Sequence, residues 1–470
     1  MNRKQKLSVL VILSVFFFKA HAFQKSDKLE VYPVDDEIRQ SMHNPAYTVK
    51  VRTPGGKWQD VFTYKVRVDL DDPQEASLAY FDFEGTVEVS VTGNTGKIED
   101  VAIRPFSCDI SHKQKKNTIT FTLDQPRKLS VEFNGDRFHN LHLFANGMET
   151  SGPDPSDPDV IYFGPGIHTP GDDPAKIYRI PENKTVYIAG GAVVRTTFVA
   201  SDASNVKLMG RGIIDGGKYG LKIHNTDRVS IKDLIFMNIR SYTVFGGNSN
   251  HIHIDNIKSI SSDRYSDGID LMSCNEVNIS NVFLRNSDDC LAFYGHRWDY
   301  YGGAKNYNIT NAVLWADVAH PVFIGIHGNP AEVDTLQNFS FRDIDILEHD
   351  EDSRIFQGCM AINSGDNTLV KEVSFEDIRV EDFEEGQLFN LRIVKNGAFN
   401  KVPGRGIEDI SFKNIHYDGK NGTPSVIEGF DADRRVRNVS FENVIINGEK
   451  LMEGSQHIKI LGHTDRIEFH

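Results

Sequence analysis

Val229-Ser-Ile-Lys-Asp-Leu234, Ile252-His-Ile-Asp-Asn-Ile257 and Val277-Asn-Ile-Ser-Asn-Val282 are three copies of one six-residue pattern. Each copy has two apolar residues two positions apart, then Asn or Asp, then a further apolar residue. Alternate residues of a strand face the same side, so the first two apolar residues point inward and the Asn or Asp marks a turn. The pattern recurs at 307–312, 339–344, 373–378, 410–415 and 439–444, with a shorter copy at 206–208.

Successive copies of this pattern start 23 to 37 residues apart. A constant motif with a variable spacing indicates a coiled strand whose loops differ in length. Stacked coils would place the Asn and Asp side chains in a ladder that bonds the turns above and below. We therefore predict an all-β chain with a right-handed parallel β-helix over residues 156–470. A leucine-rich repeat fits poorly, because its consensus and its helical half are both missing.

Residues 23–155 follow a different pattern. Short runs at 47–51, 86–91, 118–123 and 129–133 alternate apolar and polar residues, and turn residues separate them. Alternation with a period of two means that one face of each strand is buried. No helical period is evident, so we predict an antiparallel β-sandwich, joined to the β-helix through the Pro- and Asp-rich segment 152–158. Because a solenoid needs caps, we expect the sandwich to cover one end.

The first 22 residues have the features of a signal peptide. Positive charges at Arg3, Lys4 and Lys6 precede an apolar run over residues 7–18, and Ala20-His-Ala22 offers a cleavage site. A short N-terminal anchor is the alternative, and no later run is apolar enough to cross a membrane. We expect a secreted or periplasmic protein after cleavage near Ala22.

Composition narrows the possible partners. The 470-residue chain has a formal net charge of −14, which argues against a general nucleic-acid or membrane-surface binder. Its four cysteines are scattered and form no C-x-x-C pair, so we expect buried free thiols rather than a zinc site or a disulfide scaffold. These are Cys108, Cys274, Cys290 and Cys359.

Three aspartates carry the functional prediction. Asp267 precedes Asp288 by 21 residues and Asp289 by 22, close to the length of one coil. The three carboxylates should therefore meet on one wall, where mutual repulsion raises the pKa of at least one of them. A protonated carboxyl beside ionised neighbours provides the general acid and base that glycoside hydrolysis requires. Two other interpretations remain: Asp is common at β-helix turns, and clustered carboxylates bind calcium.

The motifs around these aspartates resemble those of a known family. Ser266-Asp267-Gly268, Asn286-Ser-Asp288-Asp289-Cys290 and His320-Pro-Val-Phe-Ile-Gly325 are similar to the motif series of the family 28 glycoside hydrolases, the polygalacturonases. A sandwich joined to a β-helix resembles the related family 49, the dextranases and isopullulanases.

The resemblance implies an inverting hydrolase that needs no metal or other cofactor. Asp288 would be the general acid that protonates the glycosidic oxygen. Asp267 and Asp289 would hold and deprotonate the attacking water, with acid and base far enough apart to admit it. His320 would tune the carboxylates by hydrogen bonding.

Two departures from family 28 leave the substrate open. The family's Arg-Ile-Lys motif, which holds a substrate carboxylate, should fall near residues 358–363, where no basic residue stands. Arg392 and Lys395 lie one coil later and are candidate substitutes. Pro321 stands where the family has a glycine after the histidine. We therefore expect a polysaccharide or oligosaccharide substrate, polygalacturonase-like or dextranase-like, without naming the sugar, the linkage or the mode of attack.

The loop 294–303 supplies candidate sugar contacts. Trp298, Tyr300 and Tyr301 suit the apolar face of a sugar ring, with His296 and Arg297 as polar partners. The alternative is that these aromatic residues only pack the loop. Shortly after His320, His327 and Asn329 are further candidates.

Two other functions remain open. A polysaccharide lyase on a β-helix would use an Arg or Lys base, often with calcium, and give an unsaturated product. A non-catalytic carbohydrate-binding solenoid would keep its function after Asp288→Asn. Fold alone does not separate these possibilities.

Overall fold

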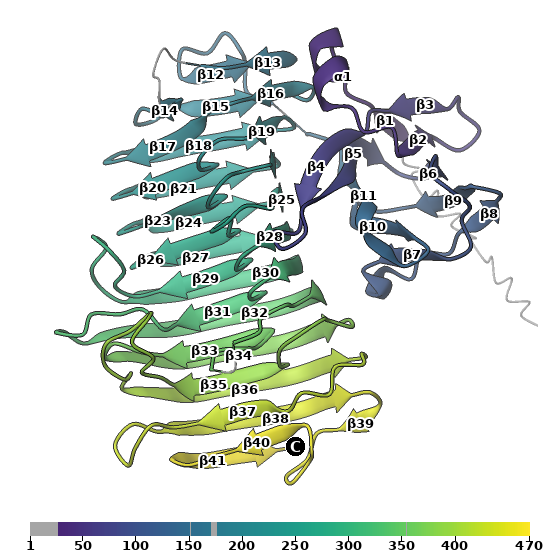
Figure 1. Ribbon diagram of the computed structural model, residues 1–470. Helices are drawn as coiled ribbons and strands as arrows, with labels where there is room; N and C mark the ends of the chain where they lie inside the picture. Colours follow the sequence, from purple (N-terminus) through teal and green to yellow (C-terminus); the bar gives the residue numbers. More distant parts are fainter. Residues whose placement is uncertain (1–26, 151, 171–175, 354) are drawn as a thin grey trace, which may run out of the picture.

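The computed structural model describes residues 27–150, 152–170, 176–353 and 355–470. The predicted signal peptide lies outside these residues. Strands dominate, and the described helices are the short α1 (Asp36–Met42) and the 3₁₀ turn η1 (Phe106–Cys108). Figure 1 shows a tall stack of coils with a smaller β-domain against one flank. Among the described residues, no helix is both long and apolar enough to span a bilayer.

The N-terminal part is a sandwich of two sheets around a shared apolar core. The first sheet contains β1 (Lys28–Glu30), β5 (Gln74–Glu84), β11 (Asp136–Gly147), β10 (Arg127–Phe133) and β7 (Val101–Arg104), with β4 (Tyr64–Val68) paired to β5. The second contains β3 (Gln59–Val61), β2 (Tyr47–Arg52), β6 (Val87–Gly93), β9 (Thr118–Leu123) and β8 (Lys113–Lys115). The prediction of a purely antiparallel sandwich is wrong at one pairing, because β5 and β11 run parallel.

The C-terminal part is the predicted right-handed parallel β-helix. An 11-stranded sheet forms one wall, in the order β14 (Ile177–Arg179), β17 (Thr197–Ser201), β20 (Leu221–His224), β23 (Val244–Gly247), β26 (Ile269–Met272), β29 (Leu291–Tyr294), β31 (Val322–Gly325), β33 (Met360–Ser364), β35 (Phe389–Ile393), β37 (Ser425–Glu428) and β40 (Ile458–Ile460).

A 19-stranded sheet forms the rest of the coil. Its strands are β12 (Val160–Phe163), β13 (Gly166–His168), β15 (Thr185–Ile188), β16 (Ala192–Val194), β18 (Ser204–Gly210), β19 (Ile213–Asp215), β21 (Asp227–Lys232), β22 (Ile235–Met237), β24 (Asn250–Asp255), β25 (Lys258–Ile260), β27 (Asn275–Ser280), β28 (Phe283–Ser287), β30 (Ala304–Val318), β32 (Asp334–Glu348), β34 (Thr368–Val380), β36 (Gly406–Tyr417), β38 (Val436–Ile446), β39 (Glu449–Lys450) and β41 (Thr464–Phe469). The antiparallel pairing of β38 with β39 is the exception to its parallel pairings.

The Asn and Asp of the repeat form the predicted ladder. Asn256 Nδ2 donates to Asp233 Oδ1 at 2.7 Å, and Asn311 Nδ2 donates to Asn281 Oδ1 at 2.6 Å. All four residues have a positive φ, between 52° and 69°. Asn and Asp tolerate this left-handed backbone better than other residues with a side chain, and this explains why the repeat keeps them at the turn.

The sandwich packs along the flank of the β-helix, so the expectation that it caps one end is wrong. Its apolar residues, among them Val66 and Leu78, share a core with Ile213, Ile235 and Phe283, which face outward from the helix. This flank is too apolar to be left in water, and the sandwich covers it. The segment around α1 extends to the first coils, where it contacts β13.

All four cysteines are free thiols, as predicted. Three of them are buried, whereas Cys108 is half-buried. The expectation of a buried thiol therefore fails at Cys108.

Candidate active site

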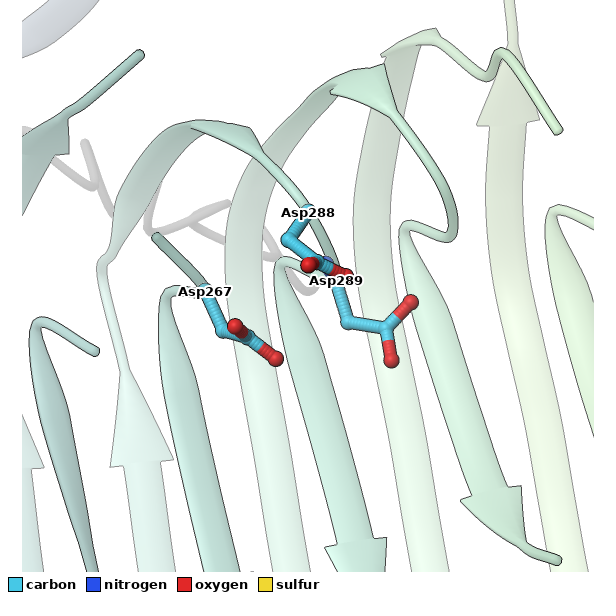
Figure 2. A group of neighbouring side chains, drawn as sticks. All are labelled: Asp267, Asp288 and Asp289. Atoms are coloured by element: carbon cyan, nitrogen blue, oxygen red, sulfur yellow. The ribbon is translucent and has the colours of Figure 1, made fainter. Parts of the chain in front are cut away.

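The three predicted aspartates meet at one edge of the 11-stranded sheet. Asp267 lies two residues before β26, whereas Asp288 and Asp289 lie just before the neighbouring strand β29. Figure 2 shows Asp267 on one coil and the Asp288–Asp289 pair on the next. The coils approach closely here, because the N–H of Gly268 donates to the Asp289 carbonyl at 2.8 Å. A Cβ at Gly268 would lie 2.2 Å from the Cys290 carbonyl oxygen, so this contact requires glycine.

The three carboxylates form one compact cluster. One oxygen of each lies within 4.8 Å of the others. Asp267 and Asp289 are buried, with exposed fractions of 4% and 6%, whereas Asp288 is half-buried. One buried oxygen of Asp267 accepts no hydrogen bond from the described residues. This leaves acceptor capacity directed at a ligand or water.

Burial and mutual repulsion raise two of the carboxyl pKa values. Burial, followed by the charge of Asp289, raises the pKa of Asp288 to about 7. Burial, followed by the charge of Asp270, holds the pKa of Asp267 well above its usual range. Near neutral pH the cluster therefore contains a protonated carboxyl group, as a general acid requires.

His320 is buried beside Asp289. Its Nδ1 lies 2.7 Å from Asp289 Oδ1, and its backbone N–H donates to the same oxygen at 3.1 Å. Its Nε2 contacts the Phe356 carbonyl, and its ring stacks on Phe323 with 4.4 Å between the ring centres. Burial lowers the pKa of His320, but the charge of Asp289 overcomes this and raises the pKa to about 9. The imidazolium can then donate from both nitrogens, which fixes the ring and stabilises the Asp289 carboxylate.

Asp270 was not predicted from the sequence, yet it is fully buried beside the cluster. Its Oδ2 lies 3.5 Å from the Arg297 guanidinium, which itself lies over the rings of Tyr294 and Trp298. Burial raises the pKa of Asp270, and Arg297 partly offsets this. The sequence could have indicated Asp270. In Ile269-Asp-Leu271 it alternates with two inward apolar residues, so its side chain points to the outer side of the sheet, near the cluster.

A pocket opens over the acids. Besides Asp267, Asp288, Asp289 and His320, its lining includes Arg297, His327, Tyr242, Tyr265, Glu351, Phe356 and Phe399. The last five were not predicted, because they come from loops that carry no repeat signal. Arg297 is the one Lys or Arg among the lining residues. The pocket thus combines aromatic surface, acids and a single guanidinium.

The remaining predicted contacts divide into two groups. His327 lines the pocket, and its Nδ1 lies 3.0 Å from the Phe399 carbonyl. Arg392 pairs with Glu428, and Lys395 is exposed. Arg392 and Lys395 both lie outside the lining of the pocket. Asn329 accepts a hydrogen bond from the Ala331 N–H, which closes a local turn.

The aromatic loop is partly open to solvent. Trp298 and Tyr301 are 51% and 63% exposed. Tyr300 is buried, with its ring 5.6 Å from that of His224. The ring centres of His296 and Tyr301 lie 4.3 Å apart, and His296 does not line the acid pocket. Trp298 and Tyr301 therefore keep free surface for a ligand, whereas Tyr300 mainly packs.

The spacing of the acids is tighter than we expected for an inverting centre. Inverting enzymes usually separate the two carboxyl groups by about 6.5–9.5 Å. Here one oxygen of each carboxylate lies within 4.8 Å of the others. A water that donates one hydrogen bond of about 2.8 Å to each of two carboxylates joins oxygens about 4.5 Å apart, which is within this limit. A calcium ion fits the same gap, since its oxygen ligands lie about 2.3–2.6 Å away.

Comparison of the sequence with known proteins identifies a family of glycosyl hydrolases. The model described as "Glycosyl hydrolases family 28" matches residues 217–463, just over half of the chain. Endopolygalacturonase I of Aspergillus oryzae is 26% identical over 241 residues, which cover 49% of this chain and 59% of that protein. An exopolygalacturonase of Arabidopsis thaliana is 22% identical, over 44% of this chain and 46% of that protein. The chain therefore spans about three fifths or less of these relatives' length.

Two solved structures share the fold. Dex49A from Penicillium minioluteum aligns with a TM-score of 0.50 at 13% identity, over 91% of this chain and 94% of that one. The family 28 exopolygalacturonase of Yersinia enterocolitica aligns with a TM-score of 0.51 at 12% identity, over 81% and 96%. Together with the family match and the three motifs that converge on one pocket, these findings show that the chain belongs to family 28 of the glycosyl hydrolases.

Proposed function

We propose that the protein is an inverting glycoside hydrolase that cleaves O-glycosidic bonds in a polysaccharide or oligosaccharide. One observation carries the hydrolysis: three carboxylates from adjacent coils gather within 4.8 Å, and the pKa of one, Asp288, is raised to about 7. The inverting course is supported by the resemblance to family 28 and is tested by the product analysis below. A carboxyl group with this pKa can donate a proton near neutral pH while its neighbour remains a base.

The reaction follows from the positions of the acids. The Asp288 carboxyl donates its proton to the glycosidic oxygen as the bond to the anomeric carbon breaks. A water held by Asp267 and Asp289 attacks that carbon and gives its proton to Asp289. We assign the role of base to Asp289, because the contact of its Oδ1 with His320 Nδ1, at 2.7 Å, holds this carboxyl group in one orientation.

The pocket suits a sugar chain. Its lining offers the aromatic rings of Tyr242, Tyr265 and Phe356 for the apolar face of a sugar, with Arg297 and His327 for its polar groups. The similar curated proteins are polygalacturonases, and one similar structure is Dex49A. We therefore propose a polygalacturonase-like or dextranase-like substrate.

Product analysis tests this proposal directly. Purified protein should be incubated with oligogalacturonides and with isomaltooligosaccharides, and the first product followed by proton NMR. We expect hydrolysis with inversion at the anomeric carbon. Retention would contradict the proposed roles of Asp267 and Asp289, since it requires a covalent intermediate.

Two controls separate hydrolysis from other functions. An unsaturated product that absorbs in the ultraviolet, with activity lost in a chelator, would identify a lyase that uses calcium. If Asp288→Asn left the function intact, a non-catalytic binding solenoid would be the better interpretation.

We also propose that the protein is exported. The charged start, apolar run and Ala20-His-Ala22 support this. Mass spectrometry of the mature protein from the culture or periplasmic fraction should find an N-terminus at Phe23. A cell-associated chain that keeps Met1 would contradict export by cleavage.

A further inference from the structure

The loop between β29 and β30 contains a tight hairpin over residues 297–300. The N–H of Arg297 donates to the Tyr300 carbonyl at 3.1 Å, and the N–H of Tyr300 donates to the Arg297 carbonyl at the same distance. Trp298, at the turn, has a φ of 55°, a left-handed backbone that bulky residues rarely adopt. Such a turn persists only where the surrounding structure holds it, so the contacts at the base of the hairpin determine its position.

Asp334, the first residue of β32, holds the base of this hairpin. Because β32 pairs with β30, Asp334 belongs to the coil after the hairpin. Its side chain is buried at 8% exposure, and its Oδ2 accepts a hydrogen bond from the His296 N–H at 3.0 Å. A Cβ at Gly295 would lie 2.3 Å from the same oxygen, so only glycine lets the chain pass this close. A carboxylate of one coil thus fixes the loop of the coil before it.

Two further contacts support this base. Ser273 Oγ lies 3.0 Å from the carbonyl oxygens of both Gly295 and Gly302, so it joins the two ends of the loop. Arg405, which precedes β36, donates from Nη2 to the Asp334 carbonyl at 2.6 Å. The backbone of Asp334 is therefore itself held in place by a later coil.

The anchored N–H of His296 is one residue away from Arg297, the guanidinium of the acid pocket. Arg297 lies 3.5 Å from Asp270 and lines the pocket. Burial and the charge of Asp289 raise the pKa of Asp288, and the charge of Arg297 partly offsets this rise. The pKa of Asp288 therefore depends on where the hairpin places Arg297.

We propose that Asp334 is a positioning residue of the active site: its carboxylate holds the His296 N–H and thereby sets the hairpin that keeps Arg297 beside the acids. Asp334 does not line the acid pocket, so it acts through Arg297 and not on the sugar. The inference rests on the proposed function for its effect on turnover, whereas the anchoring of the hairpin can be measured without a substrate.

The test compares Asp334→Ala with Asp334→Asn in the full chain, on hexagalacturonate or isomaltohexaose, whichever the wild type cleaves. Alanine removes the acceptor, so kcat/KM should fall about ten- to a hundredfold, because small misplacements in an active site are costly. The fall of kcat/KM at alkaline pH should also move to higher pH, because Arg297 no longer offsets the raised pKa of Asp288. Asparagine keeps an acceptor oxygen and should restore kcat/KM to within about twofold of the wild-type value.

Trp298 reports the motion of the hairpin directly. Time-resolved anisotropy of tryptophan fluorescence, with Trp298→Phe to subtract the other two tryptophans, should show about twofold more nanosecond motion in Asp334→Ala. Asp343→Ala is the matched control, because Asp343 lies farther along the same strand and pairs with Arg379 at 2.8 Å. This control should leave kcat/KM, its pH profile and the anisotropy unchanged.

The outcomes separate this inference from a structural role and from the proposed function. If Asp334→Ala keeps its kcat/KM, or loses only folded protein without a change in pH profile or anisotropy, the inference is overturned. If the wild type cleaves neither glycan but the anisotropy responds as expected, hydrolysis is wrong and the anchor stands. If cleavage proceeds and the anisotropy of Asp334→Ala matches that of the wild type, the anchor alone is wrong.

Discussion

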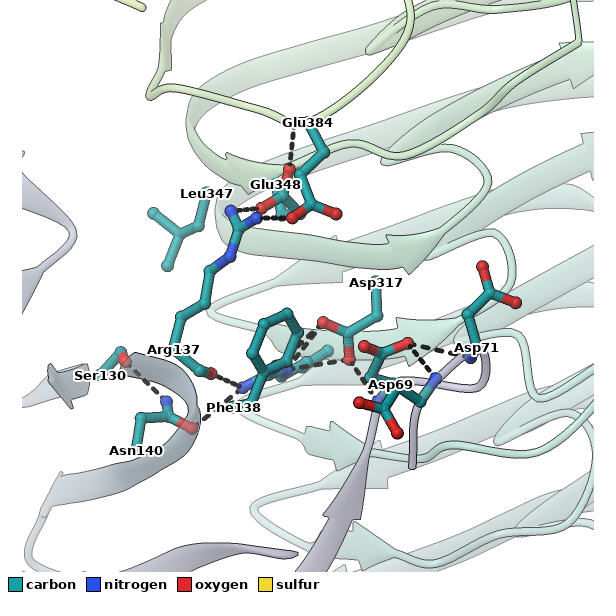
Figure 3. A network of polar contacts seen from close by, with 12 residues as sticks. Asp69, Asp71, Ser130, Arg137, Phe138, Asn140, Asp317, Leu347, Glu348 and Glu384 are labelled. Atoms are coloured by element: carbon teal, nitrogen blue, oxygen red, sulfur yellow. Dashed lines mark hydrogen bonds and ion pairs between the residues drawn. The ribbon is translucent and has the colours of Figure 1, made fainter. Parts of the chain in front are cut away.

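The contact between sandwich and β-helix and the acid pocket both bury charged side chains, but the two regions differ in the number of acids for each basic partner. At the contact, Arg285 is fully buried, its guanidinium bonds Asp317 at 2.9 Å, and it also donates to Asn140 Oδ1 at 3.0 Å. Figure 3 shows the same arrangement nearby, where Arg137 meets Glu348 and Glu384 and where Asp317 accepts from the Asp69 N–H.

In the pocket, acids outnumber their partners. Its lining holds four acids, one guanidinium and two histidines, and a fifth acid, Asp270, is buried beside it. The basic groups are those of Arg297, His320 and His327. Unpaired buried carboxylates destabilise a fold, whereas paired ones hold neighbouring elements in place. The buried Arg285–Asp317 pair therefore serves the fold, whereas the surplus of acids at the pocket indicates a site for chemistry.

The largest effect should follow from removing the base of the cluster. Asp289→Asn should lower kcat about 10²–10⁴-fold, the usual size of one acid–base contribution. KM should change little, because the substrate contacts are intact. Steady-state kinetics with circular dichroism would check this, and a loss of activity that tracks unfolding would contradict it.

Breaking a pair at the contact should instead affect stability. Asp317→Leu leaves the Arg285 guanidinium buried without its carboxylate and should lower the free energy of unfolding by about 3–5 kcal/mol. Urea denaturation measures this loss. The double variant Arg285→Met/Asp317→Leu is the control, since it should recover much of the stability, and a single variant as stable as the wild type would show that the pair is not structural.

The pH dependence of kcat/KM should show the raised pKa of Asp288. Because the pKa of Asp288 is raised to about 7, the acid is lost as pH rises through 7, and kcat/KM should fall about tenfold per pH unit above it. Asp289 contributes to this raised pKa, so the residual activity of Asp289→Asn should fall at a lower pH. An unshifted profile would contradict the coupling between the two.

Neutralising one crowded acid should have a small stabilising effect. The pKa of Asp267 is raised by burial, so the native state favours its protonated form, and this stability is lost as pH rises through the folded pKa. Asp267→Asn should therefore gain about 1 kcal/mol at pH 8 and little at pH 4. Denaturant titration at both pH values tests this, and a loss at pH 8 would mean that Asp267 is a structural residue.

Much of the fold was predictable because the repeat is explicit in the sequence. Two inward apolar residues and a turn residue with a left-handed backbone determine each coil, so the ladder of Asp233 and Asn256 followed from residue types alone. The parallel pairing of β5 with β11 could not be predicted in this way, because alternation of apolar and polar residues indicates which face is buried but not the direction of the partner strand.

The same limit applies to the pocket. Asp267 and Asp288 could be placed together from the sequence, because they lie about one coil apart and adjacent coils stack. Arg392 and Lys395 were plausible substitutes in the sequence, yet the cation in the pocket is Arg297, placed by the path of a loop. Loop paths depend on packing that no repeat encodes, which is why Phe356, Phe399 and Glu351 were missed.

We infer that the crowded acids serve the chemistry and not the fold. The decisive experiment measures both kcat/KM and the free energy of unfolding for Asp288→Asn. We predict that turnover falls at least about 10²-fold while the protein is as stable as the wild type or more stable. A variant that loses stability and keeps its turnover per folded molecule would contradict the claim.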